Sequence, residues 1–292
     1  MTTPFLKWAG GKRWLASAEL LPIPSDYERY IEPFLGGAAV FFSLCPDRAI
    51  LSDINPDLIG LYQIIKSDPA GLQNLMEVHQ ELHDKDYYYK MRAYKPRCEL
   101  RKAARFLYLN RTCWNGLYRV NIKGDFNVPI GTKDAVVLDT DDFKNVSKTL
   151  KNATLKCVDF EKSIDQADEG DFLFLDPPYT VKHNYNGFIK YNEKIFSWDD
   201  QVRLQKAVVR AASRGVYIAI TNADHNSIHQ LYEGIGKYIQ LQRHSVLAGS
   251  ADKRIPTTEA MYLINISDKA MPPTISAGDI ARSKAKFHAK AK

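Results

Sequence analysis

The amino-acid sequence predicts an α/β fold with a mostly parallel sheet, and three observations support this prediction. Over residues 29–55 a short apolar strand, a glycine turn, a helix and a second strand follow one another, which is the rhythm of a βαβ unit. The same alternation returns over residues 154–221. Two further segments, residues 238–247 and 260–266, are expected to pair as an antiparallel hairpin at the sheet edge.

The first half of the chain contains a clear change of pattern. Residues 38–45 (AAVFFSLC) form the expected helix of the βαβ unit, and the second strand ends at SDIN, residues 52–55. From residue 56 the chain has helical segments rich in Tyr, Lys and Arg. The turn-rich stretch NGLYRVNIKGDFNVPIG, residues 115–131, then shows hairpin-like alternation. We therefore expect an inserted, mainly helical domain over residues 56–144.

The second half returns to the α/β pattern. Strands are expected near residues 154–158, at FLFL (172–175) and at VYIAIT (216–221), with a helix over residues 199–214. One sheet is expected to receive both halves of the chain. The main domain is then discontinuous.

The predicted domains are residues 1–55 together with 145–266 for the main domain, the insert between them, and a tail over residues 267–292. The tail is poor in large apolar residues and ends in SKAKFHAKAK, which is typical of a solvated basic segment.

Composition narrows the class of protein. At 292 residues and 45% hydrophobic content the chain is able to bury a real core, and a net charge of +6 makes a polyanionic partner plausible. Many metabolic enzymes carry a similar excess of positive charge, so the net charge alone does not establish a polyanionic partner. No leader sequence and no apolar run near the ~20 residues of a membrane span are present, which favours the cytoplasm and no membrane association.

The cysteines and histidines indicate neither disulfides nor a metal site. The four cysteines are scattered without a CxxC pair, which predicts reduced thiols. His79 and His83 lie one helical turn apart, but the residues between them lack the metalloprotease arrangement. We expect no metal.

The sharpest chemical signal is the tetrapeptide DPPY, which directly follows the strand FLFL. Ligand and catalytic groups in open α/β sheets gather at the carboxyl ends of strands. Asp176 is expected to supply an ionised acceptor, Tyr179 a stacking plane, and the rigid prolines backbone carbonyls. An aromatic amine attacks a methyl sulfonium poorly, because its lone pair is delocalised. Acceptors at Asp176 and the Pro177 carbonyl would stabilise the charge that develops on the nitrogen. A simple turn is the alternative, since Asp-Pro pairs commonly start turns.

A second signal is the glycine turn EPFLGGA, residues 32–38. Gly36 and Gly37 would let a cofactor approach the backbone closely, and Asp53 at the end of the next strand could accept both hydroxyls of a ribose. An Asp at a strand end is otherwise often a helix cap. The N-terminal KWAGGK, residues 7–12, lacks the spacing and the Ser/Thr of a P-loop, so a nucleotide triphosphatase is rejected.

Six motifs together resemble a known family. KWAGGK, EPFLGGAAVFF, SDIN, NGLYR, GDFNVPIG and DPPY occur in the order found in the Dam family of DNA adenine methyltransferases, the alpha group of the D12 class. The resemblance spans residues 5 to about 265. It implies a Rossmann-like S-adenosylmethionine-dependent methyltransferase sheet of seven strands, with a target-recognition domain inserted after the second strand.

The resemblance also implies roles for single residues. S-adenosylmethionine contacts are implied for Trp8, Lys12, Asp53 and Asp176, with Gly36 and Gly37 beneath the methionine part. DPPY, with Pro178 as its third residue, is then catalytic as well. The DNA-contacting residues implied are Lys7, Trp114, Asn115, Leu117, Arg119 and Pro129.

Arginine suits base recognition, because its fork donates two hydrogen bonds to guanine in the major groove. For Arg119 and Lys7, a phosphate contact or a solvated face is the alternative.

The implied activity is methylation of the exocyclic N6 amine of adenine in a short double-stranded target, with GATC as the expected sequence. The adenine must leave the stacked duplex, so base flipping is implied. The stretch KHNYNGFIKYNEKIF, residues 182–196, would close over the flipped base, with Tyr191 and Phe196 as its candidate contacts, or would be a surface loop with incidental aromatics.

Two other interpretations of the sequence remain open. One is methylation of another planar amine, cytosine N4 in DNA or a protein glutamine, against which the Asp at the head of the tetrapeptide argues. The other is a non-catalytic DNA-binding relative, against which the intact Asp176, Tyr179, Trp8 and Asp53 argue.

Overall fold

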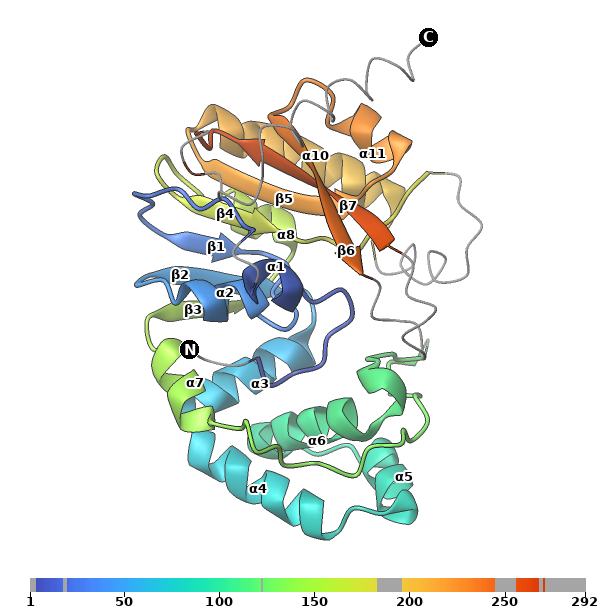
Figure 1. The fold of residues 1–292 in the computed structure, drawn as a ribbon. Coiled ribbons are helices and arrows are strands. Elements are labelled where there is room, and N and C mark those ends of the chain that lie inside the picture. The colour runs from blue at the N-terminus through green and yellow to red at the C-terminus, as the bar shows by residue number, and fades with distance from the viewer. Residues whose placement is uncertain are drawn as a thin grey trace. The chain divides into compact units, whose positions relative to one another are not determined.

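The structure, a computed structural model, describes residues 4–17, 20–121, 123–182, 196–244, 256–267 and 270. Its strands form a seven-stranded sheet in the order β3-β2-β1-β4-β5-β7-β6 (Figure 1). The strands are β1 (Tyr30–Glu32), β2 (Ala49–Asp53), β3 (Ala153–Cys157), β4 (Phe172–Leu175), β5 (Tyr217–Ala223), β6 (Lys237–His244) and β7 (Pro256–Ile264).

Helices separate the strands along the chain. They are α1 (Arg13–Ser17), α2 (Ala39–Leu44), α3 (Pro56–Ser67), α4 (Pro69–Glu81), α5 (Lys85–Ala93), α6 (Glu99–Thr112), the 3-10 turn η1 (Trp114–Gly116), α7 (Phe143–Thr149), α8 (Phe160–Ile164), α10 (Trp198–Ser213) and α11 (Asn226–Leu231). Several begin at polar caps, because a side-chain oxygen there accepts the unpaired amides of the first turn. Asn55 caps α3, and Ser197 with Asp200 forms a capping box on α10.

The predicted fold class is confirmed. Strands β2 and β3, β1 and β4, and β4 and β5 pair in parallel, whereas β7 pairs antiparallel with both β5 and β6. The sheet is therefore mostly parallel with an antiparallel hairpin at one edge, as expected of a Rossmann-like methyltransferase. The order of strands reverses at β1 and β4, and open α/β sheets bind their ligands at the carboxyl ends of the strands at such a reversal.

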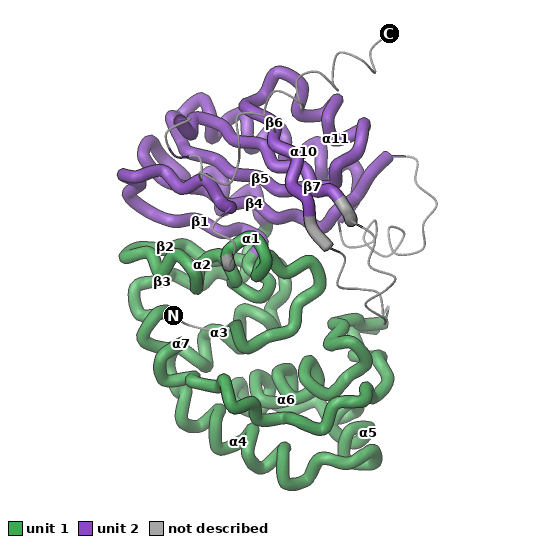
Figure 2. The backbone as a smooth tube through the Cα atoms, in the orientation of Figure 1, with its two compact units in different colours: residues 1–18, 35–159 green, residues 19–34, 160–292 purple. Residues whose placement is uncertain are grey.

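The chain divides into two compact units (Figure 2). Unit 1 holds residues 1–18 and 35–159, and unit 2 holds residues 19–34 and 160–292. Each unit has its own buried apolar residues.

Unit 1 combines β2 and β3 with the helices α1 to α7. Phe5 lies at its centre, in edge-on contact with the rings of Phe42, Tyr62 and Phe143. The predicted hairpin over residues 115–131 is only partly regular. Two isolated antiparallel bridges, Cys113 with Ile130 and Val120 with Phe126, hold it together. The turn-rich composition produces an irregular loop in place of two continuous strands.

Unit 2 combines the remaining five strands of the sheet with α8, α10 and α11. Every residue of β4 is buried, which explains its continuous apolar sequence. Arg29 and the buried Asp171 form a two-bond ion pair, with Nε to Oδ1 at 2.9 Å, beside the paired strands β1 and β4.

None of the helices in the described part of the chain is long and apolar enough to span a bilayer. In those same residues, no group of three or more His, Cys, Asp or Glu side chains is arranged to hold a metal ion. The four cysteines are free thiols, as their spacing predicted.

Candidate functional site

The DPPY segment leaves the sheet of unit 2 at the carboxyl end of β4. β4 is buried along its whole length, and the half-buried Asp176 directly follows it, next to β1 at the reversal of strand order. The carboxylate is oriented by β5, where the fully buried Thr221 donates a hydrogen bond of 2.8 Å from Oγ1 to Oδ1 of Asp176. One oxygen of the carboxylate is thus held in a fixed direction.

The rest of the tetrapeptide is held by buried polar side chains. Pro178 presents its carbonyl to Nε2 of Gln201 at 3.3 Å, and Gln201 in turn accepts a bond from Asn222 at 3.0 Å. The Pro178 carbonyl is therefore used within the protein. Pro177 is then the proline of this segment whose carbonyl is expected to face a substrate.

Tyr179 is fixed at its hydroxyl, which donates to Oε2 of Glu259 on β7 at 2.6 Å. Burial raises the pKa of the Tyr179 hydroxyl well above its ordinary value of 10.0, and the nearby carboxylates of Asp176 and Glu259 raise it further. Tyr179 is thus a neutral phenol with its ring orientation set by the antiparallel edge of the sheet. A fixed aromatic face next to a carboxylate suits a planar, amine-bearing ring.

The glycine turn lies in unit 1, directly against Trp8. A Cβ atom at Gly36 would come within 2.6 Å of the indole Cδ1, and one at Gly37 would lie 3.4 Å from the Cβ of Trp8. Gly36 also has a φ of +45°, which L side chains rarely adopt. The glycines are therefore required for the indole to lie against the turn.

Asp53 ends β2 and closes the same turn. Its Oδ2 accepts the N–H of Gly36 at 3.2 Å, and its Oδ1 accepts the N–H of Asn55 at 3.0 Å. Burial raises the pKa of the Asp53 carboxyl above 3.8, although backbone hydrogen bonds oppose the shift. Each carboxylate oxygen has two lone pairs, so Asp53 retains the capacity to accept bonds from a diol.

Lys12 is buried, and its Nζ donates to the Gly10 carbonyl at 3.0 Å. Unit 1 thus brings together five of the residues expected to hold the cofactor. They are Trp8, Lys12, Gly36, Gly37 and Asp53. An aromatic face, a carboxylate and a buried ammonium match the adenine, the ribose and the amino-acid carboxylate of S-adenosylmethionine, so the residues fit that molecule. Asp176 belongs to unit 2.

The buried Asn110 of α6 joins Lys7 to the loop that holds the other residues expected to contact DNA. Its Oδ1 accepts the N–H of Lys7 at 3.1 Å, and its Nδ2 donates to the carbonyls of Lys7 at 2.8 Å and Gly116 at 3.2 Å. A Cβ atom at Gly116 would lie 2.7 Å from the Lys7 side chain, so the two segments touch. One amide side chain therefore holds the N-terminal segment against the NGLYR loop.

The loop itself is held by its own turn-rich sequence. The Trp114 side chain is exposed, and the backbone N–H of Trp114 donates to the Pro129 carbonyl at 2.9 Å. Arg119 donates from Nε to Oδ1 of Asn127 at 2.8 Å. The terminal N–H groups of its guanidinium can still donate to other partners. Asn115 and Leu117 lie within the same turn. Sequence-distant candidates for DNA contact are thus gathered on one part of unit 1.

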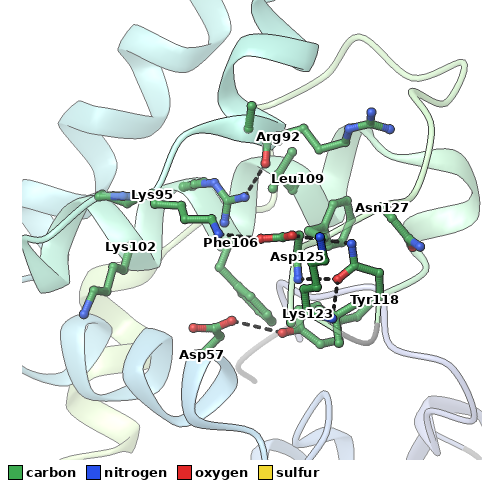
Figure 3. Close-up of a pocket in the computed structure, with 17 residues that line it drawn as sticks. Asp57, Arg92, Lys95, Lys102, Phe106, Leu109, Tyr118, Lys123, Asp125 and Asn127 are labelled. Carbon is green, nitrogen blue, oxygen red and sulfur yellow. Dashed lines mark hydrogen bonds and ion pairs between the residues drawn. The ribbon is translucent and has the colours of Figure 1, made fainter.

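A pocket of about 650 Å³ lies beside this loop (Figure 3). Two acidic residues, Asp57 and Asp125, line it together with an excess of cations. The cations are Arg92, Lys95, Lys102, Arg105 and Lys123. This positive balance suits a polyanionic partner.

The proposed closing loop is only in part within the described residues. Tyr191 lies outside them. Phe196 is buried, with its ring centroid 5.7 Å from Phe34 and 5.5 Å from Phe160. In this structure Phe196 is a core residue and does not present its ring to a substrate.

Several polar side chains that organise the site were not predicted from the sequence. Asn110 could have been noticed as an amide within the apolar segment FLYLN, and Glu259 as an acid directly before the apolar residues of β7. Thr221 and Gln201 carried no signal of their own, since hydroxyl and amide side chains are common on strands and helices.

Comparisons with known proteins agree with the geometry. Residues 8–246 match the family described as D12 class N6 adenine-specific DNA methyltransferase. The chain is 37% identical over 239 residues to the Type II methyltransferase M1.LlaDCHI of Lactococcus lactis subsp. cremoris, covering 79% of this chain and 84% of that protein. It is 39% identical over 257 residues to the Type II methyltransferase M.MjaIII of Methanocaldococcus jannaschii, covering 79% and 88%. It is 32% identical over 268 residues to the DNA adenine methylase of Haemophilus influenzae, covering 89% and 93%.

Proposed function

The chain belongs to the D12 class of N6 adenine-specific DNA methyltransferases, and we propose that it transfers the methyl group of S-adenosylmethionine to a flipped adenine in duplex GATC. The observation that carries this proposal is the Asp176 carboxylate, held by Thr221 at the end of β4 beside the fixed ring of Tyr179. Family membership favours adenine over cytosine or glutamine as the acceptor.

The cofactor residues proposed in unit 1 each have a defined task. Asp53 accepts the ribose hydroxyls, Trp8 lies along the adenine, and Lys12 balances the carboxylate of the amino-acid part, with Gly36 and Gly37 beneath it. When bound, S-adenosylmethionine supplies an electrophilic methyl group on a sulfonium. Both oxygens of Asp53 already accept a backbone N–H, so the diol would be bound through their remaining lone pairs.

The catalytic task falls to the DPPY segment. Asp176 and the Pro177 carbonyl accept hydrogen bonds from the two N–H groups of the adenine amine. The Asp176 carboxylate would stabilise the positive charge that the nitrogen gains on methylation, and the surplus N–H proton would then pass to solvent, with S-adenosylhomocysteine as the other product. Thr221 fixes the direction of the carboxylate, and Tyr179 stacks on the base that has left the duplex.

DNA recognition is proposed for the insert, residues 56–144, and for Lys7. Trp114 is the exposed aromatic that enters the base stack. Arg119 and Lys7 read guanines, and Asn115, Leu117 and Pro129 line the contact. The bonds by which Asn110 ties Lys7 to Gly116 of the NGLYR loop support this assignment. The expected contact of Tyr191 with the flipped base lies outside the described residues. We place the site of action in the cytoplasm.

Methylation of defined duplexes tests the proposal. Purified protein, S-adenosylmethionine and a GATC duplex should yield N6-methyladenine by nucleoside mass analysis. Asp176→Ala should abolish the product while leaving duplex affinity within about twofold, because the carboxylate acts on the amine. Asp199→Ala, an exposed acid on α10, is the matched control and should retain activity. Methylcytosine without methyladenine would refute the assigned substrate, and full activity of Asp176→Ala would refute the assigned residue.

Target sequence is tested separately with plasmid DNA. Methylated plasmid should resist endonucleases that cut only unmodified GATC and stay sensitive at unrelated sites. Resistance confined to sites without GATC would remove this target while leaving adenine methylation in place.

A further inference from the structure

Tyr118 lies in the NGLYR loop, yet its ring packs against a residue proposed to hold the cofactor. The rings of Tyr118 and Trp8 stack with centroids 5.9 Å apart and planes at 26°. Phe106 of α6 supports both rings, at 5.3 Å from Tyr118 and 6.2 Å from Trp8. Movement of the indole therefore has to move the tyrosine or break the stack.

The hydroxyl of Tyr118 makes a second link to the cofactor residues. It donates to Oδ2 of Asp57 in the first turn of α3 at 3.0 Å. That turn is capped by Asn55, whose Oδ1 accepts the N–H groups of Asp57 and Leu58. The N–H of Asn55 donates to Oδ1 of Asp53. The tyrosine is thus joined through the α3 cap to the carboxylate proposed for the ribose.

The two links close into one ring of contacts. Asp53 accepts the N–H of Gly36 through Oδ2, and Gly36 lies directly beneath the Trp8 indole. In order, the contact ring runs through Tyr118, Trp8, Gly36, Asp53, Asn55 and Asp57. Every member belongs to unit 1. Tyr118 is the one member that the loop contributes.

The loop side of Tyr118 faces the cationic pocket. Tyr118 lines it together with Lys123, Asp125 and Asn127 (Figure 3). Its neighbour Arg119 is one of the residues proposed to read DNA. A single side chain therefore touches both the cofactor residues and the recognition loop.

We propose that Tyr118 is a positioning residue that couples cofactor binding to recognition of the DNA target. This inference rests on the function proposed above. A cofactor held by Asp53 and Trp8 fixes the indole and the α3 cap, and both contacts of Tyr118 then hold the loop in its DNA-binding conformation. Coupling of this kind is reciprocal, so DNA raises cofactor affinity by the same factor.

The test is a pair of titrations that requires no turnover. A fluorescent GATC duplex is titrated with protein, with and without saturating S-adenosylhomocysteine, and the ratio of the two dissociation constants is the coupling factor. Couplings between sites usually amount to about 5- to 150-fold, and we expect on the order of tenfold here. Tyr118→Ala should bring the ratio close to one. Tyr118→Phe keeps the stack and loses the bond to Asp57, so its ratio should be intermediate.

Tyr94→Ala, at an exposed tyrosine just after α5, is the matched control and should keep the ratio of the native chain. A native ratio of one, or a Tyr118→Ala ratio equal to the native one, would overturn the proposal. If Tyr118→Ala does not fold by circular dichroism, Tyr118→Phe and Asp57→Asn decide the question, since unchanged ratios in both would overturn it. Loss of the proposed function is a different result, namely no N6-methyladenine from the native chain.

Discussion

Replacement of Thr221 by valine most directly tests the geometry of Asp176, the carboxylate proposed to be catalytic. Valine has nearly the shape of threonine, and Thr221 is fully buried on β5, so the change removes the Oγ1 donor and leaves the packing in place. The change removes the hydrogen bond of 2.8 Å to Oδ1 of Asp176 and a longer one of 3.4 Å to the Leu175 carbonyl. The carboxylate then loses an orienting contact during the proposed transfer, when charge develops on the amine.

The magnitude follows from the charge of the acceptor. A hydrogen bond to an ionised group contributes about 1.5–3 kcal/mol, and each 1.4 kcal/mol changes a rate tenfold. If the bond acts fully in the transition state, Thr221→Val should lower kcat by about 10- to 150-fold. Thr221→Ser keeps the hydroxyl and should recover most of the rate.

Single-turnover methylation of a GATC duplex measures this effect apart from product release. Duplex affinity should stay within about twofold, because the bond does not touch DNA. A native single-turnover rate in Thr221→Val, in a protein with an unchanged melting temperature, would refute the role of the Thr221 bond in catalysis.

Three further predictions concern buried ionisable side chains. Burial raises the pKa of Asp53 above 3.8, so acidification should weaken S-adenosylhomocysteine binding at a higher pH than for an ordinary Asp, and Asp53→Asn should bind weakly at every pH in calorimetric titrations. Burial lowers the pKa of His79 from 6.5 to about 4, so the folded state binds fewer protons than the unfolded chain between these values. The free energy of unfolding should therefore fall by about 2 kcal/mol between about pH 7 and 5, and His79→Phe should remove that fall in urea titrations. Arg111→Met should lower the free energy of unfolding by about 3–5 kcal/mol, because it leaves the buried Asp141 carboxylate without its ion-pair partner.

Each of these has a result that would count against it. A cofactor affinity for Asp53→Asn equal to that of the native chain would exclude the diol contact. An undiminished loss of stability in His79→Phe would place the pH dependence elsewhere. A change below about 1 kcal/mol for Arg111→Met would mean that water or another side chain compensates Asp141; Arg101→Met, at an exposed arginine of α6, is the control for loss of an arginine as such.

Elements defined by local pattern were predicted closely. The strand FLFL was predicted at residues 172–175 and is observed as Phe172–Leu175. A short, fully apolar run between turns is typical of a strand that is buried on both faces of a parallel sheet. The helix expected over residues 199–214 is Trp198–Ser213, and the one-residue shift reflects the capping box that Ser197 forms with Asp200. Local signals of this type are complete within a few residues.

The polar contacts of the site were not predictable in the same way. Thr221 meets Asp176 across 45 positions, and Asn110 meets Lys7 across 103, so neither contact leaves a trace in local sequence. The stretch over residues 115–131 was expected to alternate as a hairpin, but the positive φ angles of Asn115 and Gly116 turn it out of strand geometry. Motif resemblance supplied residue identities, whereas side-chain packing determined which of them touch.

The pairing of β1 with β4 has a consequence for synthesis of the chain. Arg29 and Asp171 form an ion pair beside these two strands and are 142 positions apart in the sequence. Ribosomes add about 5–20 residues per second. β1 therefore lacks its partner β4 for about 7–28 s. During this time the ribosome synthesises most of unit 1, and the edge of β1 that later pairs with β4 stays unpaired. Faster elongation across this interval should shorten the time for which β1 lacks its β4 partner.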